Sequence, residues 1–251
     1  MRTLLSSLAL AASLTLLSGP AMAGGGCGAC CPVGGDKAAG DPARADTAMG
    51  GSHAEAAPAG YGLGYKTPDF TLSDTKGKEY SLSDYEGKIV ALVFYNQDCP
   101  WVVEMWDRLG EFKEKYEDEG VVVLAVDPGV DKTPEALAEH AANRPYTILE
   151  DRSSLLALQF EATRTPEVFL HDRNGVVVYH GVFDTGPRGA EEGNRRAYTE
   201  EAVKALLEGG EIEVKETRAF GCTIKWNPET KAAWDREQQE RAGEEAAASG
   251  S

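Results

Sequence analysis

Histidine, basic residues and long apolar runs are all scarce in this sequence, and each shortage excludes a class of function. The chain has four histidines among 251 residues, with no pair at metal-ligand spacing, so we expect neither a metal site nor a bound cofactor. Its 25 basic residues are outnumbered by 41 acidic ones, which argues against binding to nucleic acid or to an anionic membrane surface. No apolar run after residue 17 approaches the length needed to cross a bilayer.

Residues 1–23 have the pattern of an export signal. A single charge precedes an apolar run, a helix breaker and a small-residue cleavage site (Arg2, Leu4–Leu17, Gly19-Pro20 and Ala21-Met22-Ala23). Cleavage leaves 24 basic and 41 acidic residues, a net charge of −17. We therefore predict an exported protein, periplasmic or extracellular, with no integral membrane segment after signal removal. Lipidation of Cys27 is the weaker alternative, because three glycines precede it where a lipobox has a large aliphatic residue.

Composition divides the remaining chain into three parts. Residues 24–60 are rich in Gly, Ala, Pro and Asp without apolar periodicity, which predicts a disordered linker. Residues 61–226 carry regular apolar patterns and form the expected folded domain. Residues 227–251 are acidic and rich in Ala and Glu, which predicts a flexible tail, or a frayed helix before a disordered end.

Within residues 61–226, segments with the period of a strand alternate with segments with the period of a helix. The expected strands lie at residues 69–72, 79–82, 89–95, 121–126, 167–171 and 176–182. The expected helices lie at residues 100–116, 134–142, 153–160 and 199–207. The order predicts an α/β fold, in which a mixed central sheet is flanked by helices and preceded by an N-terminal β-hairpin.

Cys99 stands where the strand 89–95 ends and the next helix begins. Pro100 follows it directly, and proline is favoured in the first helical turn because its missing N–H would have no partner there. A thiol at this point faces the positive end of the helix dipole and unpaired backbone N–H groups, which favour the reactive thiolate. Asp98 acts in the opposite direction, because a neighbouring negative charge raises a thiol pKa. The alternative is a buried structural cysteine.

Thr165-Pro166 is the second feature that bears on function. A proline directly before the apolar strand 167–171 removes a ladder hydrogen bond unless the backbone turns there. A cis X–Pro bond makes such a turn, whereas an ordinary trans proline at the start of a strand is the commoner arrangement.

Three ordered motifs together resemble a known family. Cys99–Val102 reads Cys-Pro-aromatic-Val, Arg164–Glu167 reads Arg-Thr-Pro-Glu, and Gly221–Trp226 reads Gly-Cys-x-Ile-Lys-Trp. These motifs are similar to those of bacterial redoxin-domain proteins, in the branch of the thioredoxin superfamily that includes peroxiredoxins and related thiol oxidoreductases. The resemblance covers about residues 61–226. It implies a thioredoxin fold, with Cys99 as the redox cysteine and Pro166 as a cis-proline facing it.

Two departures from this branch bear on the chemistry. Val102 stands three residues after Cys99, so a local Cys-x-x-Cys pair is missing. Asn96 stands where a peroxiredoxin has Thr, and Pro166 falls about where its peroxide-activating Arg would be. Asn96 could still donate a hydrogen bond to Cys99, and Arg164 could still reach the thiolate. Peroxidase activity therefore stays open.

The other four cysteines allow several pairings in an oxidising compartment. Three interpretations of Cys222 stay open: a resolving cysteine that attacks oxidised Cys99, a static disulfide with Cys99, or a buried apolar residue that holds the tail. Cys27, Cys30 and Cys31 lie in the linker, where no second pair completes a zinc site. A local disulfide or surface thiols are expected there.

The sequence leads to two functional hypotheses. In the first, the protein is a peroxiredoxin-like thiol oxidoreductase with antioxidant activity, and Cys99 attacks a small oxidant or a protein disulfide. The candidate catalytic residues are Cys99, Cys222, Arg164 and Asn96, and the residues expected to shape the substrate site are Pro100, Trp101, Thr165 and Pro166. In the second hypothesis the domain is a catalytically degenerate binding or scaffold module, because the Cys-x-x-Cys pair and the Thr are missing and Asp98 adjoins the cysteine.

Overall fold

The computed structural model describes residues 60–186 and 195–249. The expected signal peptide at residues 1–23 lies outside the described residues. So does the expected linker at residues 24–60, with Cys27, Cys30 and Cys31, except for Gly60 at its end. Within the described ranges, no helix combines the length and the apolar character needed to span a membrane.

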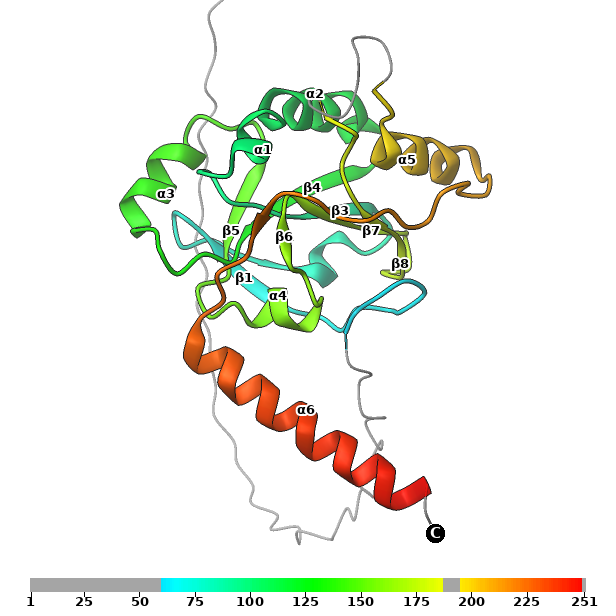
Figure 1. Cartoon of the computed structure of the whole chain (residues 1–251). Helices are drawn as coiled ribbons and strands as arrows, with labels where there is room; N and C mark the ends of the chain where they lie inside the picture. The colour runs from blue at the N-terminus through cyan, green and yellow to red at the C-terminus, as the bar shows by residue number, and fades with distance from the viewer. Residues whose placement is uncertain (1–59, 187–194, 250–251) are drawn as a thin grey trace, which may run out of the picture. The chain divides into compact units, whose positions relative to one another are not determined.

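A seven-stranded mixed sheet forms the centre of the domain, in the order β2-β1-β5-β4-β3-β7-β8 (Figure 1). Strands β3, β4 and β5 are parallel, β7 and β8 are antiparallel additions beside β3, and the antiparallel β1–β2 hairpin extends the sheet beyond β5. The strands are β1 (Thr71–Asp74), β2 (Glu79–Ser81), β3 (Ile89–Phe94), β4 (Val121–Asp127), β5 (Thr147–Glu150), β7 (Glu167–His171) and β8 (Val177–Gly181). The predicted mixed sheet and N-terminal hairpin are confirmed.

Strand β3 lies at the centre because its residues can be buried on both faces of the sheet. All six residues of β3 are buried, as expected for a continuous apolar run between two other strands. Ile89, Ala91 and Val93 belong to the core on one face, and the alternate residues Val90, Leu92 and Phe94 belong to the core on the other. The sheet therefore divides the domain into two apolar layers.

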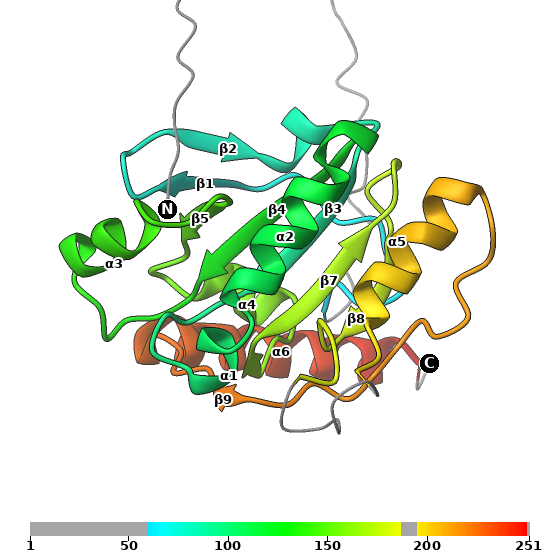
Figure 2. The ribbon, with the colours of Figure 1, turned by 90° about the horizontal axis from the view of Figure 1, so that it is seen from above.

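Helices cover both faces of the sheet. Figure 2 shows α2 and α5 on one face, where Leu109, Phe112 and Val203 pack into the first core, while α4 supplies Leu156 and Ala157 to the second core. The helices are α1 (Pro100–Val103), α2 (Trp106–Tyr116), α3 (Pro134–Ala141), α4 (Leu155–Gln159), α5 (Tyr198–Glu208) and α6 (Pro228–Ser249), with 3-10 turns at Leu82–Tyr85 and Glu117–Glu119.

The single helix expected at residues 100–116 is divided in two in the structure. The Met105 N–H bonds to the carbonyl of Val102, only three residues back, and regular helical bonding resumes when the Leu109 N–H bonds to Met105 O. This tight turn separates α1 from α2. The prediction of one continuous helix was therefore wrong, because apolar spacing alone does not report a local change of hydrogen-bond register.

Helix α6 occupies the segment for which the sequence predicts a flexible tail or a frayed helix. Its start is attached to the domain, since the Asn227 N–H donates to the Ser154 hydroxyl at 2.9 Å, next to α4. Trp226, directly before it, packs against the second core.

Candidate functional site

Cys99 occupies the junction between β3 and α1 that the sequence predicts. It is the N-cap residue of α1, and Pro100 is the first helical residue. The Cys99 carbonyl accepts hydrogen bonds from the N–H groups of Val102 and Val103, both at 2.9 Å, and its own N–H donates to Asn96 O at 3.0 Å. The Cys99 residue is only 2% exposed. The strand-to-helix turn therefore holds the thiol inside the domain.

The Thr165–Pro166 turn lies against the Cys99 sulfur. The peptide bond between the two residues is cis. The Cys99 thiol donates to the Thr165 carbonyl, with 3.0 Å between sulfur and oxygen. Thr165 is itself 2% exposed, and its hydroxyl has no hydrogen-bond partner among the described residues, so it is available to an ionised sulfur. Two motifs that are 66 residues apart in sequence thus meet at one atom.

A C-terminal segment then covers this contact. We call residues 215–226 the crossing segment; in Figure 1 it is the orange ribbon between α5 and α6. It is attached to β8 through backbone bonds from His180 N to Lys215 O and from Thr217 N to His180 O, both 3.0 Å. Further on, β9 (Cys222–Thr223) pairs antiparallel with β6 (Arg164–Thr165), and Cys222 stands opposite Thr165.

The pairing of β9 with β6 brings Cys222 beside Cys99, and the two thiols affect each other in opposite directions. Burial raises the pKa of Cys99, but hydrogen bonds from the Cys222 thiol, the Val102 amide and the Thr165 side chain outweigh it, so this pKa lies below its ordinary 9.0. Burial and the hydrogen bond to Cys99 raise the pKa of Cys222 to about 11. Cys99 is therefore the sulfur that ionises first, while Cys222 keeps its proton.

Asn96 and Arg164 lie close to this pair but contact other groups. The Asn96 side chain accepts the Asp98 N–H at 2.9 Å and so shapes the turn before Cys99. Arg164 donates to the Thr223 hydroxyl at 2.7 Å, and its charge lowers the pKa of Cys222 rather than that of Cys99. The charge of Asp98 is balanced by an ion pair with Lys132.

Glu167 stabilises the Thr165–Pro166 turn through hydrogen bonds to the residues before it. In the sequence, only its position directly after Pro166 indicates that Glu167 belongs to the site. One carboxylate oxygen accepts the N–H groups of Thr163 and Arg164, at 2.9 and 3.0 Å. The other oxygen lies 2.7 Å from the ring nitrogen Nε2 of His180. Glu167 is 2% exposed, so these contacts replace water completely.

Trp101 lies on the crevice beside Pro166, where it meets the crossing segment. Its ring contacts that of Phe220 edge to face, with 4.9 Å between the centroids. The crevice has an apolar lining that includes Trp101, Met105, Pro166, Phe183 and Phe220, and its charged side chains are Glu104, Arg108 and Asp184. It therefore joins an apolar wall to one ion pair at the edge of the candidate site.

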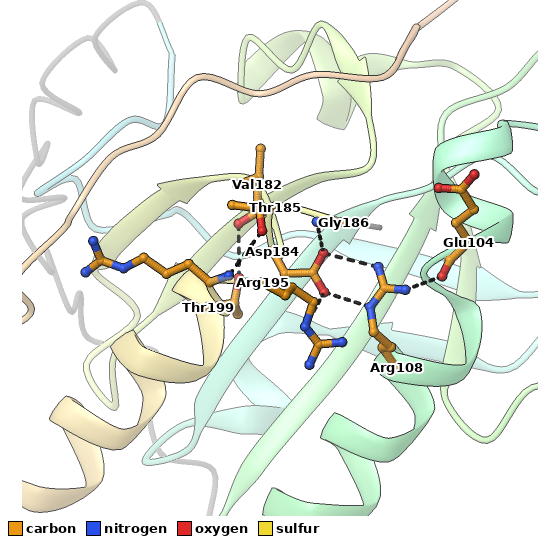
Figure 3. A network of polar contacts seen from close by, with 9 residues as sticks. Glu104, Arg108, Val182, Asp184, Thr185, Gly186, Arg195 and Thr199 are labelled. Carbon is orange, nitrogen blue, oxygen red and sulfur yellow. Dashed lines mark hydrogen bonds and ion pairs between the residues drawn. The ribbon is translucent and has the colours of Figure 1, made fainter. Parts of the chain in front are cut away.

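The ion pair in this crevice belongs to a network that sequence reasoning missed (Figure 3). Arg108 holds both carboxylate oxygens of Asp184, with N–O distances of 2.7 and 3.1 Å, and it also donates to the carbonyl of Glu104. Asp184 is 5% exposed and also accepts the Gly186 N–H at 2.7 Å. The pair connects α2 to the loop after β8, across 76 residues of sequence, and no local pattern announces such a contact.

Within the described ranges, no group of three His, Cys, Asp or Glu side chains is placed to hold a metal ion. The chemistry that the described residues offer is that of two adjacent thiols, one buried and acidic, the other partly exposed and protonated.

Comparison with known proteins agrees with this chemistry. Residues 63–180 match the AhpC/TSA family. The chain is also 35% identical over 118 residues to the thiol-disulfide oxidoreductase ResA of Geobacillus kaustophilus, an alignment that covers 46% of this chain and 66% of that protein. These similarities support the assignment of the chain to the redoxin branch of the thioredoxin superfamily. The chain spans just under two thirds of the length of this curated relative.

Two solved structures extend the similarity over most of the described domain. A hypothetical protein of Sinorhizobium meliloti has a TM-score of 0.60 and 29% identity, covering 66% of this chain and 96% of its own. An uncharacterized conserved protein of Geobacillus kaustophilus has a TM-score of 0.61 and 27% identity, covering 67% and 94% respectively. The predicted thioredoxin fold is confirmed.

Proposed function

We propose that this redoxin is an exported thiol oxidoreductase in which Cys99 and Cys222 form the redox pair. The observation that carries the proposal is the pairing of β9 with β6, because it places Cys222 opposite Thr165 and next to the Cys99 sulfur. It replaces the local Cys-x-x-Cys arrangement, in which the second cysteine lies on the same helix, with a second cysteine on a distant strand. Of the three interpretations of Cys222, we favour the resolving cysteine, because resolution of oxidised Cys99 requires the two sulfurs to be adjacent.

The reaction of the pair with a disulfide balances without a cofactor. The Cys99 thiolate attacks one sulfur of R–S–S–R′, that bond breaks, and R′–S⁻ leaves and takes up a proton. Formation of the mixed disulfide removes the charge on Cys99, which is one cause of the raised pKa of Cys222. Cys222 then loses its proton and attacks the Cys99 sulfur, and R–S⁻ leaves. Two electrons pass from the pair to the substrate, and the proton lost by Cys222 balances the one taken up by R′–S⁻.

Peroxide reduction is the second candidate, and the burial of Cys99 favours it. At 2% exposure beneath the crossing segment, Cys99 is more accessible to a small oxidant than to a disulfide in a folded protein. The thiolate attacks one peroxide oxygen, the O–O bond breaks, and the leaving oxygen departs as an alcohol or as water after protonation. Cys222 then condenses with the Cys99 sulfenic acid, releasing water and forming the same intramolecular disulfide.

Mass mapping of a full-length Cys27→Ser, Cys30→Ser, Cys31→Ser variant tests the proposal. The reduced protein is mixed separately with hydrogen peroxide and with glutathione disulfide, and the thiols are trapped at intervals. We expect both reagents to form one Cys99–Cys222 disulfide. The reagent that forms it faster, peroxide or disulfide, indicates the class of the physiological oxidant. With Cys222→Ser, Cys99 should stop at sulfenic acid or at a mixed disulfide. A Cys99 that reacts no faster than free cysteine with either reagent supports the scaffold hypothesis instead.

Export is tested separately by the N-terminus of the protein isolated from a bacterial host. Cleavage after Ala23 and recovery outside the cytoplasm are the expected results. An uncleaved N-terminus in the cytoplasmic fraction contradicts this part of the proposal, and a lipid-modified Cys27 supports the alternative anchor.

A further inference from the structure

We propose that an external thiol reduces the oxidised redoxin by attacking Cys222 and releasing Cys99, so that the transient mixed disulfide forms on the crossing segment. This inference rests on the proposed function, because it requires the Cys99–Cys222 disulfide. It assigns Cys222 a second role as the sulfur that exchanges with the reducing partner.

The two sulfurs differ in how accessible they are to an external thiol. Cys99 is 2% exposed and is enclosed by the start of α1, by the Thr165–Pro166 turn and by β9. Cys222 is only partly buried, and its neighbour Thr223 is exposed. Within the described residues β9 pairs with β6 alone, so its other edge carries no strand. A thiolate can therefore reach Cys222 without moving the helix start.

The direction of attack favours the same sulfur. Exchange at a disulfide proceeds with the attacking, central and leaving sulfurs roughly in line. An attack on Cys222 comes from the side away from Cys99, which is the outer side of β9. An attack on Cys99 has to come from the side away from Cys222, and Cys99 is only 2% exposed at the N-cap of α1, so an external thiolate has little room to approach it.

Leaving-group stability adds to this asymmetry. A disulfide breaks faster when the sulfur that leaves has the lower pKa. The Val102 amide and the Thr165 side chain lower the pKa of Cys99, and neither of these donors belongs to Cys222, the residue that takes part in the new disulfide. The released Cys99 thiolate is thus stabilised by the same groups that activate it as a nucleophile.

Arg164 places a positive charge beside the attacked sulfur. Its guanidinium donates to the Thr223 hydroxyl at 2.7 Å and lowers the pKa of Cys222 through its charge. An approaching thiolate is negative, so this charge attracts it. Attack forms a bond from the external sulfur to Cys222 and breaks the bond to Cys99. A second external thiolate then attacks the sulfur of the first external thiol in the mixed disulfide. The bond to Cys222 breaks, and the Cys222 thiolate leaves and takes up a proton.

A trapping experiment identifies the attacked sulfur. The oxidised full-length protein with the three linker cysteines changed to serine is first shown by mass to contain the Cys99–Cys222 disulfide. It is then exposed briefly to 2-mercaptoethanol with excess iodoacetamide, quenched in acid and mapped by peptide mass. The expected product carries mercaptoethanol on Cys222 and carbamidomethyl on Cys99, in at least about tenfold excess over the reverse product.

The outcomes separate this inference from the proposed function. Adducts mainly on Cys99, or equally on both sulfurs, overturn the inference and leave the proposed redox pair intact. Absence of the intramolecular disulfide at the first mass measurement overturns both. Arg164→Gln gives an independent readout: at low salt it should slow the attack several-fold, and the difference should shrink at high salt. The control is Arg173→Gln, at a residue whose backbone carbonyl bonds to Gly87 far from the redox pair. Equal rates for the two variants contradict the role given to Arg164.

Discussion

The carboxylate of Glu167 lies 2.7 Å from the imidazole of His180, and this pair of a buried and a partly buried side chain joins the two parts of the chain that bring the cysteines together. On one side, Glu167 accepts two backbone N–H groups of the turn that contacts Cys99. On the other, the backbone of His180 bonds to Lys215 and Thr217 of the crossing segment. The turn and the segment that carries Cys222 therefore share one support.

Replacing Glu167 should weaken this support measurably. Glu167→Leu leaves the partly buried N–H groups of Thr163 and Arg164 without their acceptor, and we expect the free energy of unfolding to fall by about 1–3 kcal/mol. Glu167→Gln, which keeps an acceptor oxygen, should lose less. Urea unfolding measures both. The control Glu216→Leu alters a side chain that is 66% exposed, and a loss as large as that of Glu167→Leu would contradict the prediction.

The reactivity of Cys99 should depend on pH in a way that Cys222 controls. Because the pKa of Cys99 lies below 9.0, the midpoint of its alkylation rate against pH should also lie below 9.0. Cys222→Ala removes a donor to the thiolate, so the midpoint should move upward. Cys222→Ser keeps a donor and should move it less. Timed iodoacetamide labelling with mass detection gives the profiles, and a midpoint that moves downward in Cys222→Ala would refute this account of the pair.

Gly221 should control the distance between the strands that carry Thr165 and Cys222. Its φ of +140° disfavours other residues, and a Cβ there would overlap the Thr165 carbonyl. Gly221→Ala should therefore lift β9 from β6 and slow formation of the Cys99–Cys222 disulfide by at least about tenfold. Gly209→Ala is the matched control, since Gly209 also has a positive φ but open space around it. Equal disulfide rates in the two variants would show that the close approach is unimportant.

The ion pair between Arg108 and Asp184 should contribute to stability because both side chains are largely removed from water. Their side chains are 18% and 4% exposed. Asp184→Ala leaves the guanidinium without its main partner, and we expect a loss of about 3 kcal/mol in the free energy of unfolding. The exposed pair of Lys215 and Glu211 is the control, and Glu211→Ala should cost less than about 1 kcal/mol. A double-mutant cycle with Arg108→Ala shows whether the two losses are coupled.

Much of the fold could be predicted because its main elements have strong local patterns. The run Ile89–Phe94 is apolar at every position, which a central strand requires, and Cys99-Pro100 marks a helix start through the properties of proline. The parts of the candidate site that have local sequence signals could be predicted in the same way. They placed Cys99 at a helix N-terminus and Thr165-Pro166 before a strand.

The contacts that complete the site could not be predicted in the same way. Strand β9 has two residues, too few to show a period, and it pairs with a strand whose residues lie 57 to 59 positions away. Glu167 and Asp184 owe their importance to partners that the sequence does not place beside them. Arg164 and Asn96 were expected near the sulfur, but their side chains bond to Thr223 and to the Asp98 amide, because short backbone turns offer them nearer partners.

The crossing segment is fastened on both sides of Cys222. Before the cysteine it is bonded to β8 through His180, and after it the Asn227 N–H is bonded to Ser154 beside α4. Between these two attachments β9 bonds to β6, and Ile224 is buried in the second core. Any movement of Cys222 between Cys99 and a reducing partner is therefore confined to the residues between these attachments, and it costs the β9–β6 hydrogen bonds as well as the burial of Ile224.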